Sequence, residues 1–338
     1  MRGGLALFAC AAGALAASVA VQAVPPPVIV NDAAIVGEDL PRSLEDFAFF
    51  RKRNGTDPAP RVVPYELNTP LYSDGAEKLR YIYLPEGAQI EADAEGLLQL
   101  PVGSAIIKTF AFGERFIETR VLLHRADGWL ALPYIWNAEQ TEATLALAGG
   151  RVAITTPAGE EISYRIPNKN QCKTCHSRNG EVIPIGPKAR NLSHEWLSQM
   201  VETGHLSAMP EGADILPLWS RRDEIGKPHD AGMFARAYLD VNCAHCHQPG
   251  GSASNSGLDL RWEQDDPYAI GIGKPPVAAG RGAGGLLVSI APGEPDRSII
   301  LHRMASVEPG VAMPELGRAS VDEDAIEVMR RWIAEMGK

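Results

Sequence analysis

The chain has 338 residues, of which 45% are hydrophobic and 22% are charged, and its formal net charge is −10. This composition is ordinary for a folded protein of about two domains, and it excludes a disordered chain, a coiled coil and a protein with many membrane spans. The acidic balance also excludes a general nucleic-acid binder, because phosphate backbones are bound by clustered lysine and arginine. The odd count of five cysteines, alongside eight histidines, requires an explanation.

The first 23 residues are typical of a secretory signal peptide. A positive charge at Arg2 precedes an apolar run that ends in the small-residue pattern Val-Gln-Ala at residues 21–23. We expect cleavage after Ala23, which removes Cys10 and places the mature chain in the periplasm. A membrane anchor is the alternative, but the run is slightly short for a span. Cleavage at a lipoprotein site before Cys10 would leave too short an apolar region.

The next two segments are predicted as a lead-in and a β-rich domain. Residues 24–60 form the lead-in, which contains one short helix near residues 44–50. Residues 61–166 alternate apolar and polar side chains and are rich in β-branched and aromatic residues, which predicts six or seven strands, enough for a sandwich or a barrel-like domain. The expected strands cover residues 79–84, 104–112, 116–124, 129–136, 141–147, 151–156 and 162–166.

Two local features of the β-rich domain can be predicted from its residues. The Arg-Ala-Asp-Gly string at residues 125–128 indicates a tight hairpin turn. The charged side chains of Glu118 and Arg120 share one strand face, which favours a salt bridge between them over a substrate site. No catalytic pattern is recognisable in this half of the chain.

The four remaining cysteines lie in two C-x-x-C-H strings, at residues 172–176 and 243–247. This is the attachment pattern of a c-type haem. Cysteines three residues apart on one helical turn face the same way, so both thiols can bond to one haem, and the following histidine provides the proximal ligand of the iron. The two strings, the first and second motifs below, therefore predict two covalently bound haems, attached and ligated by Cys172, Cys175 and His176 and by Cys243, Cys246 and His247.

Two other interpretations of the cysteines are weaker. A structural zinc site could be built from the two C-x-x-C pairs, and the pairs could also be disulfides or redox sites. Both leave the two trailing histidines unexplained. A zinc ion could bind them, but six ligands exceed the four of a tetrahedral zinc site. His245, inside the second motif, is expected to face solvent because its neighbours are tied to the porphyrin.

Residues 226–338 resemble a small class I cytochrome c in the order of their elements. Apolar stripes predict a helix at residues 231–241, directly before the second motif, and a short helix at residues 298–304. A capping box formed by Ser320 and Glu323 begins a terminal helix that reaches about residue 336.

The resemblance also suggests the sixth ligand of the second iron. In class I cytochromes this ligand comes from a Met-Pro pair in the loop before the terminal helix, and Met313 occupies that place here. We therefore expect Met313 to be the axial ligand of the second haem, which raises its reduction potential. Met304 is the rival, but its place on a helix stripe favours packing in the core.

Residues 167–225 carry the first motif in an unusual setting. A strand rather than an apolar helix leads into the motif, and the stretch that follows is too short for a complete class I domain. We expect this haem to be attached to the β-rich region under a mostly helical cover at residues 192–219. Its sixth ligand is left open between Met209, His205, a residue from elsewhere and none. His194 and Met200 on a predicted helix are further candidates, each with an ordinary surface or packing role as the alternative.

Further strings of the sequence lie at residues 65–74, 118–123, 134–137, 167–172, 184–192, 237–247 and 313–318. Together they resemble a family of exported bacterial dihaem c-type cytochromes, formerly known as conserved hypothetical proteins and associated with a parallel β-helix repeat protein. The resemblance covers roughly residues 40–338 and implies two covalent haems outside the cytoplasm, but it implies no particular reaction.

Together these features predict an α+β protein, with an antiparallel β-rich domain that carries an atypical haem segment and an all-α class I cytochrome c domain behind it. The expected function is electron transfer to or from a periplasmic redox partner, without nucleic acid and without a stable membrane span after signal cleavage. The acidic surface suggests a partner that is basic at its contact face. The alternatives are a peroxidase-like dihaem enzyme with an open sixth site at the first haem, and a docking module that relays electrons. The oligomeric state is left open.

Overall fold

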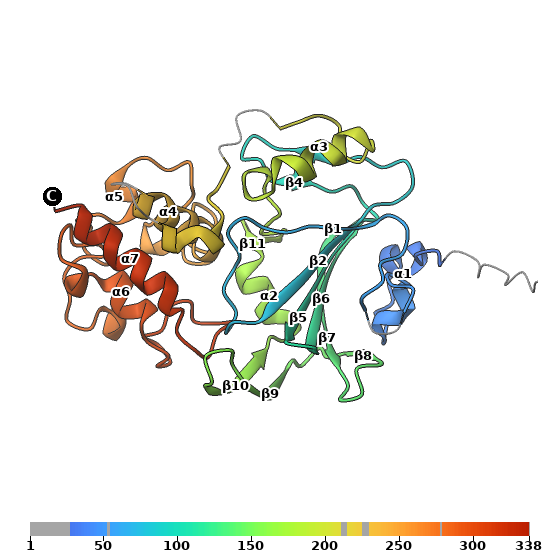
Figure 1. The fold of residues 1–338 in the computed structure, drawn as a ribbon, viewed down its shortest axis with the longest axis horizontal. Helices are drawn as coiled ribbons and strands as arrows, with labels where there is room; N and C mark the ends of the chain where they lie inside the picture. The colour runs from blue at the N-terminus through green and yellow to red at the C-terminus, as the bar shows by residue number, and fades with distance from the viewer. Residues whose placement is uncertain (1–27, 53–54, 211–214, 225–229, 278, 338) are drawn as a thin grey trace, which may run out of the picture.

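The computed structural model describes residues 28–52, 55–210, 215–224, 230–277 and 279–337 (Figure 1). The expected signal peptide, Cys10 and the expected domain boundary at residue 226 lie outside these residues. The described chain combines α and β structure, with an antiparallel sheet in its first half and helices in its second half. Within this part of the chain, no helix is both long enough and apolar enough to cross a bilayer.

The main sheet has six antiparallel strands in the order β1-β2-β5-β6-β7-β8. The expected strands are confirmed, and the hairpin between β6 and β7 turns at residues 125–128 as predicted. The expected sandwich or barrel is wrong, because β1 and β8 lie at opposite edges of one open sheet. The strands are β1 (Val62–Pro64), β2 (Glu77–Tyr83), β5 (Ala105–Phe112), β6 (Arg115–Arg125), β7 (Gly128–Trp136) and β8 (Ala143–Leu145).

Three two-stranded hairpins lie outside the main sheet. The largest, β9–β10, ends directly before the first motif, so a strand does lead into that motif. The hairpins are β3 (Glu91–Ala92) with β4 (Leu98–Gln99), β9 (Gly150–Thr155) with β10 (Glu161–Ile166), and β11 (Ser177–Arg178) with β12 (Glu181–Val182).

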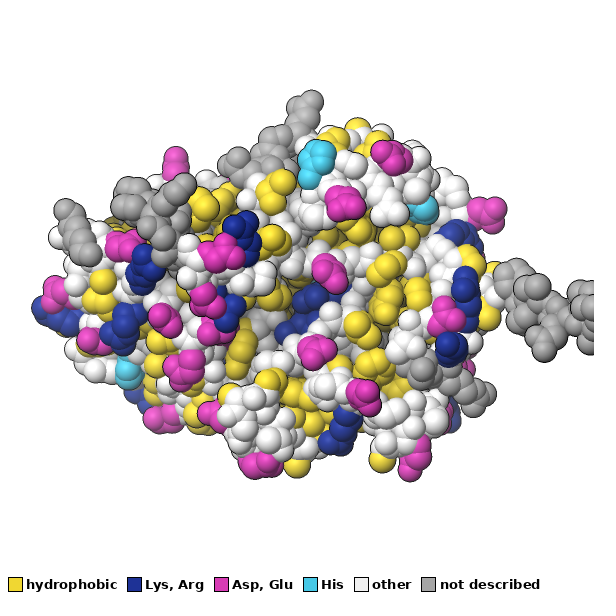
Figure 2. All heavy atoms as spheres, in the orientation of Figure 1, with side chains coloured by type: hydrophobic (Ala, Val, Ile, Leu, Met, Phe, Trp, Pro, Cys, Tyr) yellow, Lys and Arg dark blue, Asp and Glu magenta, His cyan; other side chains and the backbone are white. Residues whose placement is uncertain are grey.

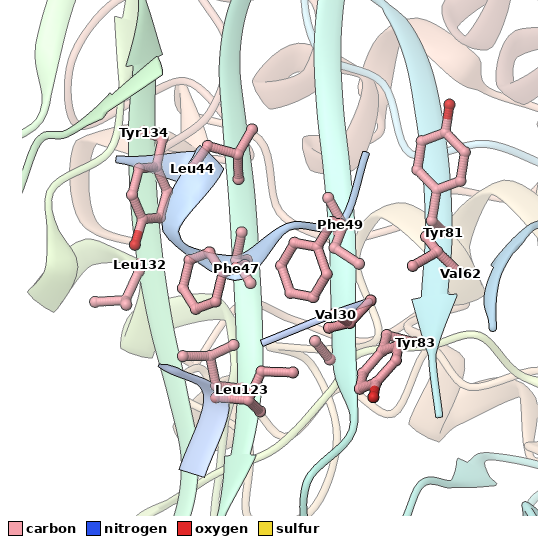
Figure 3. Packing of buried hydrophobic residues seen from close by; sticks show 14 of the residues in the cluster. Val30, Leu44, Phe47, Phe49, Val62, Tyr81, Tyr83, Leu123, Leu132 and Tyr134 are labelled. Atoms are coloured by element: carbon pink, nitrogen blue, oxygen red, sulfur yellow. The ribbon is translucent and has the colours of Figure 1, made fainter. Parts of the chain in front are cut away.

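One face of the sheet is covered by the lead-in, which contains α1 (Asp32–Val36) and a 3₁₀ helix, η1 (Leu44–Phe47). The ring of Phe47 stacks on that of Phe49 at 4.9 Å between centroids and meets the edge of Tyr134 at 5.9 Å (Figure 3). These buried aromatic contacts make the lead-in an integral part of the core. It is therefore not a loose leader to the sheet.

The opposite face of the sheet carries the first motif. Helix α2 (Lys169–Cys175) begins at a capping box formed by Asn168 and Gln171, and it packs against β7. The thiol-bearing Cys172 is buried in the apolar cluster on this face together with Ile106 and Leu122.

Helix α3 and several irregular segments complete this side of the molecule. The expected helical cover at residues 192–219 is only partly helical, because α3 ends at Glu202 and the described residues that follow it up to 218 form no helix. The elements here are η2 (Ala189–Asn191), α3 (His194–Glu202) and η3 (Trp219–Glu224).

The second half contains the helices expected from the apolar stripes, with α4 packed against α7 (Figure 1). Helix α7 begins after Asp322, whose carboxylate accepts a hydrogen bond from the amide of Ala325. The expected cap at Ser320 is therefore wrong. The elements are α4 (Asp230–Asn242), η4 (Ser254–Ser256), α5 (Pro267–Ile270), η5 (Gly280–Ala283), η6 (Pro295–Arg297), α6 (Ile299–Met304) and α7 (Glu323–Glu335).

Buried polar contacts join the two halves. Asp240 on α4 accepts from the guanidinium of Arg190 at 3.2 Å and from the ammonium of Lys188 at 3.4 Å. Burial alone would raise the pKa of Asp240, but these two cations outweigh it and hold the pKa below its usual value. The backbone amide of Tyr72 also donates to the side chain of Asn242 at 2.7 Å. The two motifs are thus carried on halves that are fixed relative to each other.

Candidate functional site

Residues of the two motifs line two cavities. The smaller cavity, of about 950 Å³, is lined by Cys243 and His247 of the second motif. The larger cavity, of about 1970 Å³, is lined by Cys172, Cys175 and His176 of the first motif. Both volumes include space that is open to solvent at the mouth. The four cysteines are free thiols.

In the smaller cavity the hydrogen bonds fix the tautomer of His247. Its Nδ1 lies 2.9 Å from the hydroxyl of Ser256, which itself donates to the carbonyl of Ala253 at 2.7 Å. Because that hydroxyl has already used its hydrogen, it accepts from Nδ1–H and leaves the Nε2 lone pair free. Burial lowers the pKa of His247, which keeps the ring neutral. This is the form that a metal-ligating histidine needs.

The structure places Met313 in the wall of the same cavity as His247. The amide of Met313 donates to the carbonyl of Arg303 at 3.0 Å, and the guanidinium of Arg318 donates to the carbonyl of Met313 at 2.9 Å. These two bonds hold the backbone of the Met313 loop. Met304 also reaches this cavity, but it is buried on α6 in the apolar core of the helical half.

A carboxylate from the β-rich half supports the Met313 loop. Asp74 accepts hydrogen bonds from the amide of Ala319 at 2.7 Å and from the amide and hydroxyl of Ser320, both at 2.9 Å. Asp74 is buried and has a positive φ of 54°, a conformation that Asp and Asn tolerate better than most residues. No pattern in the sequence predicts that Asp74 supports the Met313 loop. The only signal is that it ends the string at residues 65–74.

In the larger cavity His176 has the same arrangement as His247. Its Nδ1 lies 2.9 Å from the carbonyl of Ile183, which can only accept, so Nδ1 carries the proton and Nε2 has the free lone pair. Burial lowers the pKa of His176 to about 4. Both motif histidines are therefore neutral and oriented by a second hydrogen bond, as proximal ligands are.

The predicted sixth ligands of the first motif do not reach this cavity. Met209 is 36% exposed, and neither it nor His205 lines either cavity. The ring of His205 is bonded to the hydroxyl of Thr203 at 2.8 Å. The segment that contains His205 lies beside the start of β3, because the amide of Ile90 donates to the carbonyl of His205 at 2.8 Å. His194 and Met200 also lie outside both linings.

Cations from the sheet line the larger cavity. The predicted salt bridge is confirmed, since Arg120 donates to both carboxylate oxygens of Glu118, at 2.8 and 2.6 Å. Lys108 and Arg80 line the cavity beside Arg120, and the buried Nε of Arg80 has no hydrogen-bond partner. Figure 2 shows Lys and Arg side chains at the bottom of a hollow near the centre of the face in view.

The two motifs touch at a cluster that we call the seam: Cys175, His245 and Cys246. One ligand atom from each lies within 4.8 Å of the others. The thiol of Cys246 also lies 3.9 Å from the carbonyl of Thr174. The expectation that His245 faces solvent is wrong, because its Nδ1 is buried without a partner and the residue lines the larger cavity.

The geometry bears on which cofactor these residues could hold. A shared zinc site would need both cysteine pairs at one ion, but Cys172 and Cys243 line different cavities. A c-type haem at each motif needs free thiols, a neutral histidine and an adjacent cavity, and both motifs provide these. The unpartnered buried Nε atoms of Arg80 and Arg318, one in each cavity, also suit the carboxylates of a haem.

Comparison of the chain with protein-family models, with curated proteins and with solved structures gives no match. The assignment of a function therefore depends on the motifs and on the geometry of the two cavities.

Proposed function

We propose that the protein is a periplasmic dihaem c-type cytochrome that transfers electrons through two adjacent haems. Haem iron, when bound, supplies one-electron chemistry at a potential that its axial ligands and burial adjust. The first haem would be held by Cys172, Cys175 and His176. The second would be held by Cys243, Cys246 and His247, with Met313 as sixth ligand.

The contribution of the chain to this function is to present ligands and to exclude water. The two proximal histidines have their Nδ1 protons bound to Ile183 and Ser256, so Nε2 is available without reorientation. The smaller cavity has mostly apolar walls, which would keep water from a bound iron and, together with a methionine ligand, would favour the reduced state. The aliphatic side chains of that wall include Leu258, Leu260, Ile270, Ile290, Ile299 and Ile300.

The seam is the observation that carries the proposal. Each motif thiol is the point at which a porphyrin edge would be bonded, and the thiols of Cys175 and Cys246 come from different motifs yet belong to one cluster within 4.8 Å. Two haems attached there would approach each other at their edges. Tyr238 and Pro314 line both cavities, so the partition between them is thin. A protein that only stored two independent haems would have no need of this contact.

The charge of the chain favours a particular kind of redox partner. The net charge is −10, and haem carboxylates would make it more negative. A donor or acceptor with a basic contact face would be attracted at low ionic strength.

The test is haem stoichiometry in protein that is exported during expression in cells that attach c-type haem. Intact mass and the pyridine haemochrome spectrum should show two haems per chain and an N-terminus at residue 24. The double variant Cys172→Ala/Cys175→Ala and the double variant Cys243→Ala/Cys246→Ala should each retain one haem. Cys10→Ala is the matched control, because a cysteine removed with the signal peptide cannot alter haem content. Protein without covalent haem, or with bound zinc, would contradict the proposal.

A further inference from the structure

The sequence leaves the sixth ligand of the first motif open, and the ligands it suggested do not line the larger cavity. We propose that Lys108 is this ligand, with its amine nitrogen bonded to the iron opposite His176. This inference rests on the proposed function, because it requires a haem at the first motif. It assigns a role to a lysine in a region that has no recognisable catalytic pattern.

The sheet directs Lys108 into the larger cavity. Side chains alternate along β5, so Lys108 shares a face with Ile106, which belongs to the apolar cluster around Cys172. Lys108 pairs in register with Arg80 on β2 and Arg120 on β6, in the middle of the sheet. Both Lys108 and His176 line the cavity. A ligand on a central strand is held more firmly than one on a surface loop.

Other side chains that could ligate iron also line this cavity, and the Nδ1 of one of them, His245, has no hydrogen-bond partner. Lys188 binds the carboxylate of Asp240 at 3.4 Å. The hydroxyl of Tyr72 is bonded to Ser320 at 2.8 Å. Burial raises the pKa of Tyr65 to about 12, which keeps it a neutral phenol. His245 belongs to the seam, beside the thiols of both motifs.

The side chain of Lys108 has no hydrogen bond or ion pair with any described residue; its ammonium lies 4.9 Å from the centroid of the Phe110 ring. Burial lowers the pKa of Lys108 well below its usual value, and the charges of Arg80, Lys78 and Arg120 lower it further. The opposing carboxylate, Glu118, is engaged by Arg120 and by the hydroxyl of Tyr164. Ligation releases one proton to solvent and uses the nitrogen lone pair, without any change in oxidation state.

The same cation could instead bind a haem carboxylate, and substitution separates the two roles. Lys108→Arg keeps the positive charge but cannot ligate iron, because the guanidinium stays protonated. Lys108→Met and Lys108→His remove the charge but can supply a ligand atom, and Lys108→Ala removes both. Lys188→Met is the matched control, since it removes a lysine from the same cavity that is already paired with Asp240.

The experiment measures haem content, the spin state of the ferric irons by electron paramagnetic resonance, and carbon monoxide binding by the reduced protein. We expect wild type and Lys188→Met to contain two low-spin haems that bind no carbon monoxide. Lys108→Ala and Lys108→Arg should retain two haems, one of which becomes high-spin and binds carbon monoxide. Lys108→His should return that haem to the low-spin state.

Two results would overturn the assignment: a first haem that is already high-spin in wild type, or a Lys108→Arg protein in which both haems stay low-spin. The first result would favour the peroxidase-like alternative. A wild-type protein with fewer than two haems would count against the proposed function instead, so the two failures are distinguishable. If Lys108→Ala does not fold, the arginine and histidine variants decide the question.

Discussion

A buried charged network behind the larger cavity sets the energetics of that side of the sheet. Glu118 is fully buried, and it is bonded by Arg120 through two hydrogen bonds and by the hydroxyl of Tyr164 at 2.8 Å. A buried carboxylate is tolerated only when its partners compensate for the lost hydration. The intact network therefore adds little net free energy of folding, but removing one of its members leaves a buried charge uncompensated and destabilises the fold.

We predict that Arg120→Met lowers the free energy of unfolding by about 3–5 kcal/mol, because it leaves the carboxylate of Glu118 without its main partner. The double variant Glu118→Leu/Arg120→Met should lose less than the single one. Arg297→Met, which breaks an exposed pair with Glu294, should cost at most about 1 kcal/mol. Urea unfolding of the apo-proteins measures all three. An Arg120→Met protein that loses no more free energy of unfolding than Arg297→Met would refute this account.

Some side-chain contacts of this protein can be predicted from the sequence, and others cannot. Glu118 and Arg120 are two residues apart on one strand, so local alternation was enough to predict their salt bridge. Lys108 and Asp74 gain their roles from residues far along the chain, at His176 and Ser320. Met209 illustrates the converse error, because a local Met-Pro pair suggested a ligand in a segment that the fold keeps away from the cavity.

Among the elements, the Met313 loop depends on a contact from the other half of the molecule. Asp74 binds the residues that precede α7, and Arg318 binds the carbonyl of Met313. The loop therefore has support from the β-rich half as well as from its own half. The helical second half, cut from this chain, would lack one of the two supports.

We predict that Asp74→Gly releases the Met313 loop at lower urea concentration and lowers the free energy of unfolding by about 1–3 kcal/mol, because two buried donors and one half-buried donor lose their acceptor. Glycine adopts the positive φ of this position without strain. Asp74→Asn, which keeps an acceptor oxygen, is the matched control. The charge-transfer absorption band of methionine-ligated ferric haem reports the ligation of Met313. If Asp74→Gly and Asp74→Asn lose the absorption band at the same urea concentration and unfold with the same free energy, this role of Asp74 is contradicted.

The boundaries of the elements were largely predictable, whereas their assembly was not. Alternation located β2 and β5 to β7, and apolar stripes located α4 and α7. Strand number alone could not distinguish an open sheet from a sandwich. The lead-in covers one face of the sheet, and α2 packs against the other.

For the whole molecule, the main consequence of the fold is that two segments about 70 residues apart in sequence meet at their cysteines. Arg190, Lys188 and Asp240 fix the halves beside the larger cavity, and the amide of Asn179 donates to the carbonyl of Gly250 at 2.9 Å next to the motifs. The sequence predicted two haem sites and an all-α second half. It could not predict that the two sites share a seam, because no local pattern encodes the docking of one half on the other.

The central claim is that the two motifs hold haems close enough to act as one electron-transfer unit. The most direct measurement is the electron paramagnetic resonance spectrum of the fully oxidised protein, compared with the sum of the spectra of the two single-haem variants, Cys172→Ala/Cys175→Ala and Cys243→Ala/Cys246→Ala. We predict two haems per chain and a wild-type spectrum broadened by coupling between the two irons, which the sum does not reproduce. A wild-type spectrum equal to the sum, or a chain without two covalent haems, would contradict the account.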